Sequence, residues 1–190
     1  METFENKLKR VLAENIEIVP YDTKWPEMFE EEKKHLLHCL PKELIIRIEH
    51  FGSTAIPDLA AKPIIDILVE IKSLDETKER IVPILEHKGY DYFWRPSFGN
   101  DTPPFYAWFI KRNSKGNRTH HIHMVKADFE HWDRLFFRDY LIEHPKLAKE
   151  YQKLKTNLSK EYSKDRVTYT KEKSDFVVRI TEMAKIYYKV

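Results

Sequence analysis

Residues 50–71 read HFGSTAIPDLAAKPIIDILVEI, and this stretch decides the fold. It opens on a Gly-Ser-Thr turn at 52–54 and closes on IIDILVEI at 64–71, a run rich in β-branched residues. Successive side chains of a strand point to opposite faces. One face of this run is wholly apolar, and the other carries Asp66 and Glu70. The pattern therefore predicts a buried strand with two carboxylates on one side, shortly after a tight turn.

The segments around this strand predict a mixed α/β part. Further strands are expected at 16–19, 44–50, 90–94, 106–111 and 119–125, which are short β-rich runs between turn-forming residues. Pro26 is expected in the first turn of a helix. Ser73 and Glu76 form a capping box for a second helix, which Pro83 should interrupt.

The remainder, 126–190, has helical periodicity. Asp128 is expected to cap the first of three helices, Pro145 to begin the second, and Thr170 to cap the third. We therefore expect one domain of the α/β (α+β) class, with a mixed sheet part over 1–125 and a three-helix part over 126–190.

The composition places few demands on partners. Lys and Arg (33) nearly balance Asp and Glu (31), so the formal net charge of +2 indicates neither nucleic acid nor a membrane surface. The single cysteine, Cys39, excludes an internal disulfide and a cysteine-based zinc site. No run approaches the roughly 20 apolar residues of a membrane span, and no signal peptide is recognisable. A cytoplasmic protein is expected.

The segment IEHFGSTAIPDLAAKPIIDILVEI, at 48–71, resembles the signature of the GrpB family. Segments at 16–36, 119–125, 137–145 and 169–176 resemble further blocks of that family in the same order. The family is similar in turn to the nucleotidyltransferase superfamily of the polymerase-beta type. This resemblance implies a nucleotidyltransferase-like mixed β-sheet flanked by helices, with a C-terminal helical region, that binds a nucleoside triphosphate or another phosphorylated small molecule. GrpB-like sequences also occur fused to dephospho-coenzyme A kinase, which implies a link to coenzyme A metabolism.

In that superfamily a Gly-Ser turn holds the triphosphate. The resemblance therefore implies ligand binding at Gly52, Ser53 and Thr54. A glycine lets a ligand approach the backbone closely, and successive amides with two hydroxyls can cradle phosphate oxygens. The structural alternative is a strand-to-helix turn in which one hydroxyl caps a helix.

Superfamily carboxylates at alternate strand positions hold two magnesium ions, and this implies a metal ligand at Asp66. A carboxylate in an apolar strand needs a cation or several donors, because burying it alone costs several kcal/mol. The structural alternative pairs Asp66 with Lys62, with Arg47 or with the amides of the turn.

The second superfamily carboxylate is missing, because Leu68 occupies its position. At roughly 3.3 Å per residue, Glu70 lies about 13 Å from Asp66, too far to share one ion, and a solvated residue at the strand end is expected. His121 and His123 project to one face about 6.6 Å apart and can replace it. With Asp66 they form the candidate catalytic and metal-binding set, for magnesium, manganese or zinc. Alternatively, the histidines bind phosphate, transfer protons or hydrogen-bond to Asp66.

Basic residues complete the candidate anion site. They are Lys62, Arg118, Arg138 and Lys173. The alternative for Arg138 is an ion pair with its neighbour Asp139. Lys155 and the lysines near it are expected on a solvated helix face. Tyr106 and Trp108 are able to stack a base, but core packing is the favoured interpretation.

Three hypotheses for function stay open. The first is nucleotidyl transfer from a nucleoside triphosphate, with Asp66, His121 and His123 around the metal. The second is a non-catalytic nucleotide- or cofactor-binding module linked to coenzyme A metabolism, which Leu68 favours. The third is a His/Asp metal-dependent hydrolase. We favour a nucleotidyltransferase-like fold that binds a phosphorylated ligand; the sequence leaves catalysis, the acceptor and the base preference undecided.

Overall fold

The computed structural model describes residues 3–96 and 103–190, and the chain divides into two compact units. The sheet unit comprises Thr23–Ala55 and Ile64–Trp132. The helical unit comprises Met1–Asp22, Ile56–Pro63 and Asp133–Val190. The helical unit therefore takes two segments from the N-terminal third of the chain, which a division by chain order does not anticipate. The expectation of one domain stays a prediction.

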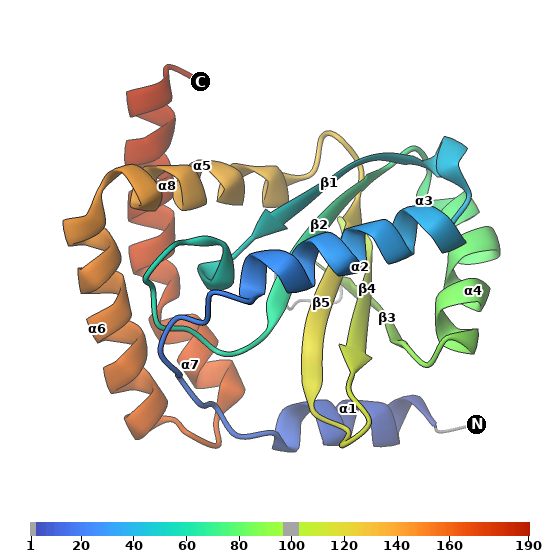
Figure 1. Cartoon of the computed structure of the whole chain (residues 1–190), viewed down its shortest axis with the longest axis horizontal. Helices are drawn as coiled ribbons and strands as arrows, with labels where there is room; N and C mark the ends of the chain where they lie inside the picture. The colour runs from blue at the N-terminus through green and yellow to red at the C-terminus, as the bar shows by residue number, and fades with distance from the viewer. Residues whose placement is uncertain (1–2, 97–102) are drawn as a thin grey trace. The chain divides into compact units, whose positions relative to one another are not determined.

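The sheet is mixed, as the sequence predicts (Figure 1). Its strands are β1 (Ile45–Phe51), β2 (Ile65–Ile71), β3 (Asp91–Pro96), β4 (Phe105–Arg112) and β5 (Arg118–Val125). They lie in the order β1-β2-β5-β4-β3. The central pair β2 and β5 is parallel, and the other neighbouring pairs are antiparallel. The expected strand at 16–19 is wrong: Val19 forms only an isolated bridge with Ala61 in the helical unit.

Helix α2 (Trp25–Cys39) crosses one face of this sheet (Figure 1). Pro26 lies in its first turn, as expected, and Phe29 and Leu36 are buried. Ser73 caps the helix as predicted, because the Glu76 amide donates to Ser73 Oγ at 3.3 Å, which is one of the two bonds of a capping box. The helix that it begins is interrupted as predicted near Pro83. Its segments are α3 (Leu74–Glu76), a π-helical turn η3 (Thr77–Ile81) and α4 (Val82–His87).

Short 3-10 turns join these elements. They are η1 (Lys42–Leu44), η2 (Ser53–Ala55) and η4 (Glu130–Trp132). Gly52 joins the end of β1 to η2, and η2 contains Ser53 and Thr54 of the Gly-Ser-Thr motif. Turn η4 corrects one prediction: the helix expected to be capped by Asp128 begins only at Asp133, after η4.

The helical unit is built from α1 (Phe4–Ala13), α5 (Asp133–Glu143), α6 (Pro145–Glu161), α7 (Arg166–Glu172) and α8 (Ser174–Tyr188). Its core joins α5, α6 and α8 to Ile56 and Leu59, so the middle of the signature stretch belongs to this unit. The expected third helix is two helices. Thr170 lies inside α7, which Asp165 caps by accepting from the Thr168 amide at 3.0 Å.

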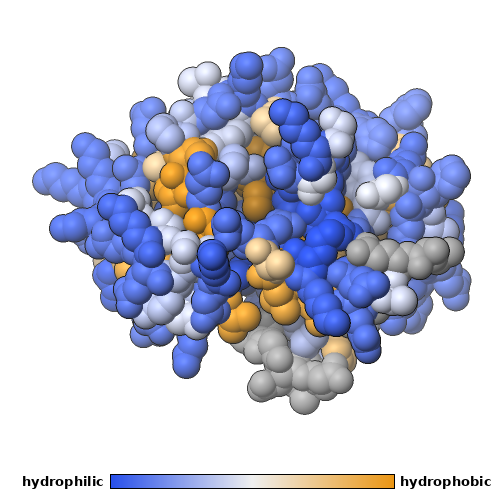
Figure 2. All heavy atoms as spheres, turned by 90° about the horizontal axis from the view of Figure 1, so that it is seen from below, coloured by the Kyte–Doolittle hydropathy of each residue, from blue (hydrophilic) through white to orange (hydrophobic). Residues whose placement is uncertain are grey.

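Lys155 corrects a further prediction, because it is only 2% exposed. Its ammonium donates to the Ala60 carbonyl at 2.7 Å and lies 4.7 Å from the Tyr151 ring centroid. On the face drawn in Figure 2, hydrophilic side chains predominate and hydrophobic ones form small separate patches. In the described part of the chain, the helices are too short or too polar to cross a bilayer.

Candidate metal and phosphate site on the sheet

The parallel pairing of β2 and β5 brings the predicted acidic and histidine residues together. In the register, Asp66 is opposite His121 and Leu68 is opposite His123. Paired residues of neighbouring strands share a face, so Asp66, His121 and His123 all lie on one side of the sheet. The Nδ1–H of His121 donates to Asp66 Oδ1 at 3.1 Å. His120 faces the other side, as expected, and lies 3.4 Å through Nε2 from the carbonyl of Met28 on α2.

These three side chains converge closely enough to consider a common ion. One ligand atom from each of Asp66, His121 and His123 lies within 4.8 Å of the others. Two ligands of one transition metal at about 2.1 Å lie at most about 4.2 Å apart, so a small rotamer adjustment would complete the set. Both histidines are buried, while the Asp66 side chain is 30% exposed. The cluster can therefore be reached from solvent on the Asp66 side.

Gly52 places the Gly-Ser-Thr turn directly against Asp66. Phe51, the last residue of β1, pairs with Asp66, and Gly52 follows with φ +77°. A Cβ atom at Gly52 would lie 2.5 Å from Asp66 Oδ2, well inside contact distance. Only glycine combines this left-handed conformation with this close approach. The turn and the carboxylate are thus parts of one site.

The two hydroxyls of the turn differ in their environments. Thr54 is 1% exposed, and its Oγ1 donates to the Ile64 carbonyl at 3.3 Å and lies 3.0 Å from His50 Nε2. The Thr54 hydroxyl therefore ties the turn to the segment before β2 and to His50, and does not cap a helix as the structural alternative expected. Ser53 is partly exposed at the start of η2. Ser53 is the hydroxyl of the turn that a ligand can reach.

Glu70 contradicts its prediction as a solvated residue. It is 9% exposed, and Arg47 Nε donates to its Oε2 at 2.9 Å. The Arg47 guanidinium also lies 3.8 Å from the Trp132 ring centroid. Arg47 is therefore the partner of Glu70, and the alternative that pairs Arg47 with Asp66 is wrong.

Sequence reasoning missed two residues on this face. Glu49 of β1 is opposite Leu68 in the register, so its side chain leaves the sheet on the same face as Leu68, although its carboxylate is not among the ligand atoms that lie within 4.8 Å of one another. His131 of η4 is 2% exposed, and its ring centroid is 5.7 Å from that of His123. Alternation along 44–50 puts Glu49 on one face of its strand, but nothing local indicates which residue of β2 it meets.

Aromatic side chains enclose the histidines. The Tyr106 ring stacks on His123 at 5.5 Å, and the Trp108 ring meets His121 edge-on at 5.1 Å. Tyr106 and Trp108 are 2% and 7% exposed, which supports core packing over base stacking. Trp108 Nε1 is buried and has no hydrogen-bond partner in the described part of the chain. A buried unpaired N–H is costly, and a ligand oxygen would satisfy it.

The predicted basic residues divide between the two units. Arg118 begins β5 in the sheet unit and is 6% exposed. Lys62, Arg138 and Lys173 belong to the helical unit. There, Lys62 and Lys173 place their ammonium groups 5.3 and 5.4 Å from the ring centroid of Tyr169. Arg138 Nε donates to Asp139 Oδ1 at 2.6 Å, the ion pair that the structural alternative expected.

Comparison with known proteins identifies relatives over most of the chain. A family model described as GrpB protein matches residues 15–183. UPF0157 protein YqkA of Bacillus subtilis is 38% identical over 175 residues, covering 92% of this chain and 48% of YqkA, so this chain spans about half of that relative. Glutamate-rich protein GrpB of Alkalihalophilus pseudofirmus is 37% identical over 164 residues, 86% of this chain and 92% of that protein. The crystal structure of conserved protein GrpB from Enterococcus faecalis matches with a TM-score of 0.78 and 34% identity, over 92% of this chain and all of that one.

Proposed function

The chain belongs to the GrpB family, and we propose that its sheet unit binds a divalent metal ion at Asp66, His121 and His123 and a phosphorylated ligand, a nucleotide first of all, at Gly52 and Ser53. One observation carries the proposal. The ligand atoms of the three residues lie within 4.8 Å of one another, beside the glycine that touches Asp66. The metal and phosphate parts of the site are thereby adjacent.

The donor set favours particular metals. Two imidazoles with one carboxylate suit zinc, manganese or iron better than magnesium, which prefers oxygen ligands. A bound ion would supply positive charge for phosphoryl oxygens. The hydrogen bond from His121 to Asp66 orients both side chains before an ion arrives.

The chain's own groups support a phosphorylated ligand. Gly52 brings the backbone of the turn against Asp66, because a Cβ there would lie 2.5 Å from Asp66 Oδ2, so a phosphate bound at the turn would lie beside the proposed metal ion. Ser53 offers a hydroxyl at the same turn. Trp108 Nε1 offers a buried donor beside His121. Phosphate oxygens would accept hydrogen bonds from the backbone amides of the turn, from the Ser53 hydroxyl and from Trp108 Nε1–H.

Nucleotidyl transfer is the reaction class proposed for this site, and Glu49 is the observation that favours it. Leu68 alone would remove the second carboxylate, but Glu49 is opposite Leu68 on the same face as Asp66. The hydrolase and the non-catalytic module, including one that binds coenzyme A, are outcomes of the tests below.

Metal binding is tested first by calorimetric titration of zinc, manganese and magnesium into metal-free protein. We expect zinc or manganese to bind with one equivalent, and Asp66→Asn or His123→Gln to weaken binding at least tenfold. Asp75→Asn and His87→Gln are matched controls on exposed positions of the same unit and should bind like the wild type. Wild-type affinity in Asp66→Asn would overturn the metal site.

Ligand binding is tested by thermal unfolding with ATP, GTP, CTP, UTP and coenzyme A, each with the preferred metal or with chelator. A ligand at 100 times its Kd stabilises the folded state by about 2.7 kcal/mol. We expect a metal-dependent rise with at least one nucleotide that is lost in Asp66→Asn. A rise that chelator leaves intact would favour the non-catalytic module. Metal binding with no response to any nucleotide would favour the hydrolase and overturn the nucleotide proposal.

A further inference from the structure

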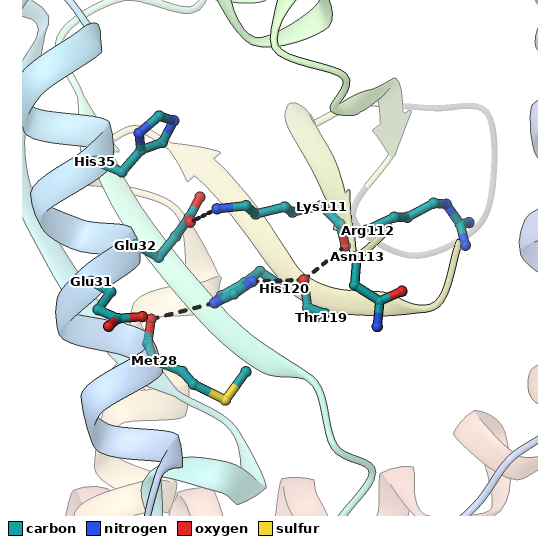
Figure 3. A pocket seen from close by; sticks show the side chains of 9 residues that line it. All are labelled: Met28, Glu31, Glu32, His35, Lys111, Arg112, Asn113, Thr119 and His120. Atoms are coloured by element: carbon teal, nitrogen blue, oxygen red, sulfur yellow. Dashed lines mark hydrogen bonds and ion pairs between the residues drawn. The ribbon is translucent and has the colours of Figure 1, made fainter. Parts of the chain in front are cut away.

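The sheet unit contains a hollow on the face opposite the Asp66 cluster. A cavity of about 320 Å³ lies between α2 and the β4–β5 hairpin (Figure 3). His120 lines this cavity, whereas His121 and His123 point to the other face of β5, towards Asp66. Nothing in the proposed function uses this cavity.

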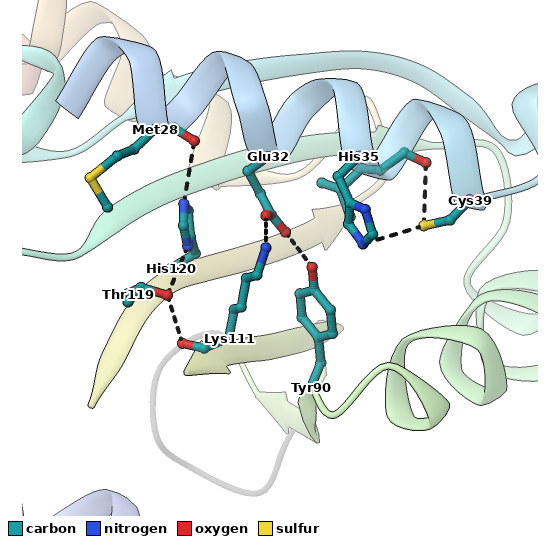
Figure 4. A network of polar contacts seen from close by, with 9 residues as sticks. Met28, Glu32, His35, Cys39, Tyr90, Lys111, Thr119 and His120 are labelled. Atoms are coloured by element: carbon teal, nitrogen blue, oxygen red, sulfur yellow. Dashed lines mark hydrogen bonds and ion pairs between the residues drawn. The ribbon is translucent and has the colours of Figure 1, made fainter. Parts of the chain in front are cut away.

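An ion pair reaches across the cavity from one wall to the other. The Lys111 ammonium on β4 pairs with the carboxylate of Glu32 on α2 (Figures 3 and 4). The other Glu32 oxygen accepts from the Tyr90 hydroxyl at 2.5 Å. Glu32 is 1% exposed, but the Lys111 side chain is 35% exposed. The two partners therefore differ sharply in their access to water.

Because Glu32 is buried and Lys111 is partly exposed, the cavity favours a positively charged ligand over a negatively charged one. A cation that takes the place of Lys111 at Glu32 leaves the buried carboxylate paired, and Lys111 can turn to solvent at little cost. An anion that takes Lys111 away leaves Glu32 buried and short of its cation, which is strongly unfavourable. Lys111 itself demonstrates that an alkylammonium group fits against Glu32. The cavity is thus suited to a cation.

The other charged groups of the lining point the same way. Glu31, next to Glu32 on α2, is exposed and forms no ion pair with residues 3–96 or 103–190. Arg112 is already held by Asp91, with Nε at 2.9 Å from Oδ2. Burial lowers the pKa of His120 and of His35, so both imidazoles are neutral at pH 7 and do not repel a cation. Glu31 is the uncompensated charge of the lining.

We propose that this cavity binds a small organic cation carrying primary ammonium groups, of the diamine or polyamine class. One ammonium group pairs with Glu32 in the position of the Lys111 ammonium, and a second pairs with Glu31 at the mouth. The methylene chain between them lies against the side chain of Met28. This proposal does not depend on the metal or on the nucleotide.

The test is a titration of wild-type protein, followed by calorimetry and by amide NMR shifts, with four probes of equal chain length. They are 1,4-diaminobutane, n-butylamine, 1-butanol and butyrate. We expect the diamine to bind with a Kd of about 1 mM or tighter, butylamine to bind more weakly, and the other two not to bind. Equal responses to butylamine and butanol, preference for butyrate, or no response to the diamine at 50 times that concentration would overturn the proposal.

Variants locate the binding and separate it from non-specific attraction. Glu31→Gln should weaken the diamine about tenfold and leave butylamine nearly unchanged, because only the second ammonium contacts Glu31. Lys111→Gln should tighten both amines several-fold, because it removes the internal competitor. Glu30→Gln, an exposed change on the same helix outside the cavity, should do neither. Equal weakening by Glu30→Gln and Glu31→Gln would show that only surface charge attracts the amine, and would refute the site. The wild-type titration and Glu31→Gln decide the matter if Lys111→Gln does not fold.

Discussion

Substitution of Gly52 by alanine tests whether the Gly-Ser-Thr turn and Asp66 form one site. Two costs add. A residue with a Cβ at φ +77° costs about 1–2 kcal/mol. The new Cβ would also lie 2.5 Å from Asp66 Oδ2 and 3.1 Å from its Cγ, and such overpacking costs about 1–3 kcal/mol more. We expect Gly52→Ala to lower the free energy of unfolding by about 2–5 kcal/mol and to displace the Asp66 carboxylate.

The chain supplies matched controls for the first cost. Gly89 and Gly116 also have positive φ, +84° and +81°, but a Cβ at either position meets nothing within 4 Å. In urea unfolding followed by tryptophan fluorescence, the free energy of unfolding of Gly89→Ala and of Gly116→Ala should be about 1–3 kcal/mol higher than that of Gly52→Ala. In an Asp66→Ala background, which removes Oδ2 and Cγ but keeps the Asp66 Cβ at 3.0 Å, the cost of Gly52→Ala should fall but stay above the cost of strain alone. If Gly52→Ala lowers the free energy of unfolding no more than Gly116→Ala does, the turn is not in close contact with Asp66 and the two do not form one site.

Three further predictions concern polar groups of the interior. In urea unfolding, Lys155→Met should lower the free energy of unfolding by about 1–3 kcal/mol, because it leaves the Ala60 carbonyl without its donor. Lys153→Met, at an exposed position of the same helix, should stay within about 0.5 kcal/mol of the wild type. Equal effects of the two variants would show that Lys155 lies on a solvated face. Burial lowers the pKa of His120 from 6.5, so the folded protein binds fewer protons than the unfolded chain, and stability should fall as the pH drops below about 6.5. That fall should be smaller in His120→Asn, and an unchanged pH profile would count against the buried neutral imidazole. Glu70→Gln should cost about 1 kcal/mol and Glu79→Gln almost nothing, and the reverse order would contradict the pairing of Glu70 with Arg47.

Strand positions were predictable because they depend on local alternation. The five strands of the sheet lie within two residues of the expected ranges. The failure at 16–19 has a physical reason. Ile16 and Ile18 bury themselves against Leu158 and Tyr169 in the helical unit, so their apolar character reports packing on helices and not a place in the sheet. A short apolar run does not distinguish these two environments.

Helix boundaries depended on which of several capping residues was used. Thr170 and Asp165 are both good caps, and Asp165 caps a short helix that begins five residues before the expected start. The prediction of a solvated position for Lys155 was wrong because helical periodicity identifies the apolar stripe of a helix but not a buried hydrogen-bond acceptor on another segment. The Ala60 carbonyl that accepts from Lys155 comes from a segment 95 residues away in sequence.

The parts of the candidate site that depend on one strand alone, namely the face to which each side chain points, were predictable. Alternation puts His121 and His123 on one face of β5 and Asp66 on one face of β2. Which strands become neighbours, and in which register, depends on long-range pairing that alternation does not encode. For that reason Glu49 was missed, and Glu70 was assigned to solvent although Arg47 is opposite it on β1.

The alternation of β5 also gives its two faces different chemistry. His121 and His123 face the carboxylate of Asp66, while His120, between them and the hairpin, faces the α2 wall with Glu31 and Glu32. A metal ion with phosphate on one face and an organic cation on the other are consistent with these two settings. A slip of one residue between β2 and β5 would exchange the faces and destroy both sites. Packing holds this register: the buried residues Ile65, Ile67 and Ile122 lie on the face that carries His120, and keeping them there keeps Asp66 opposite His121.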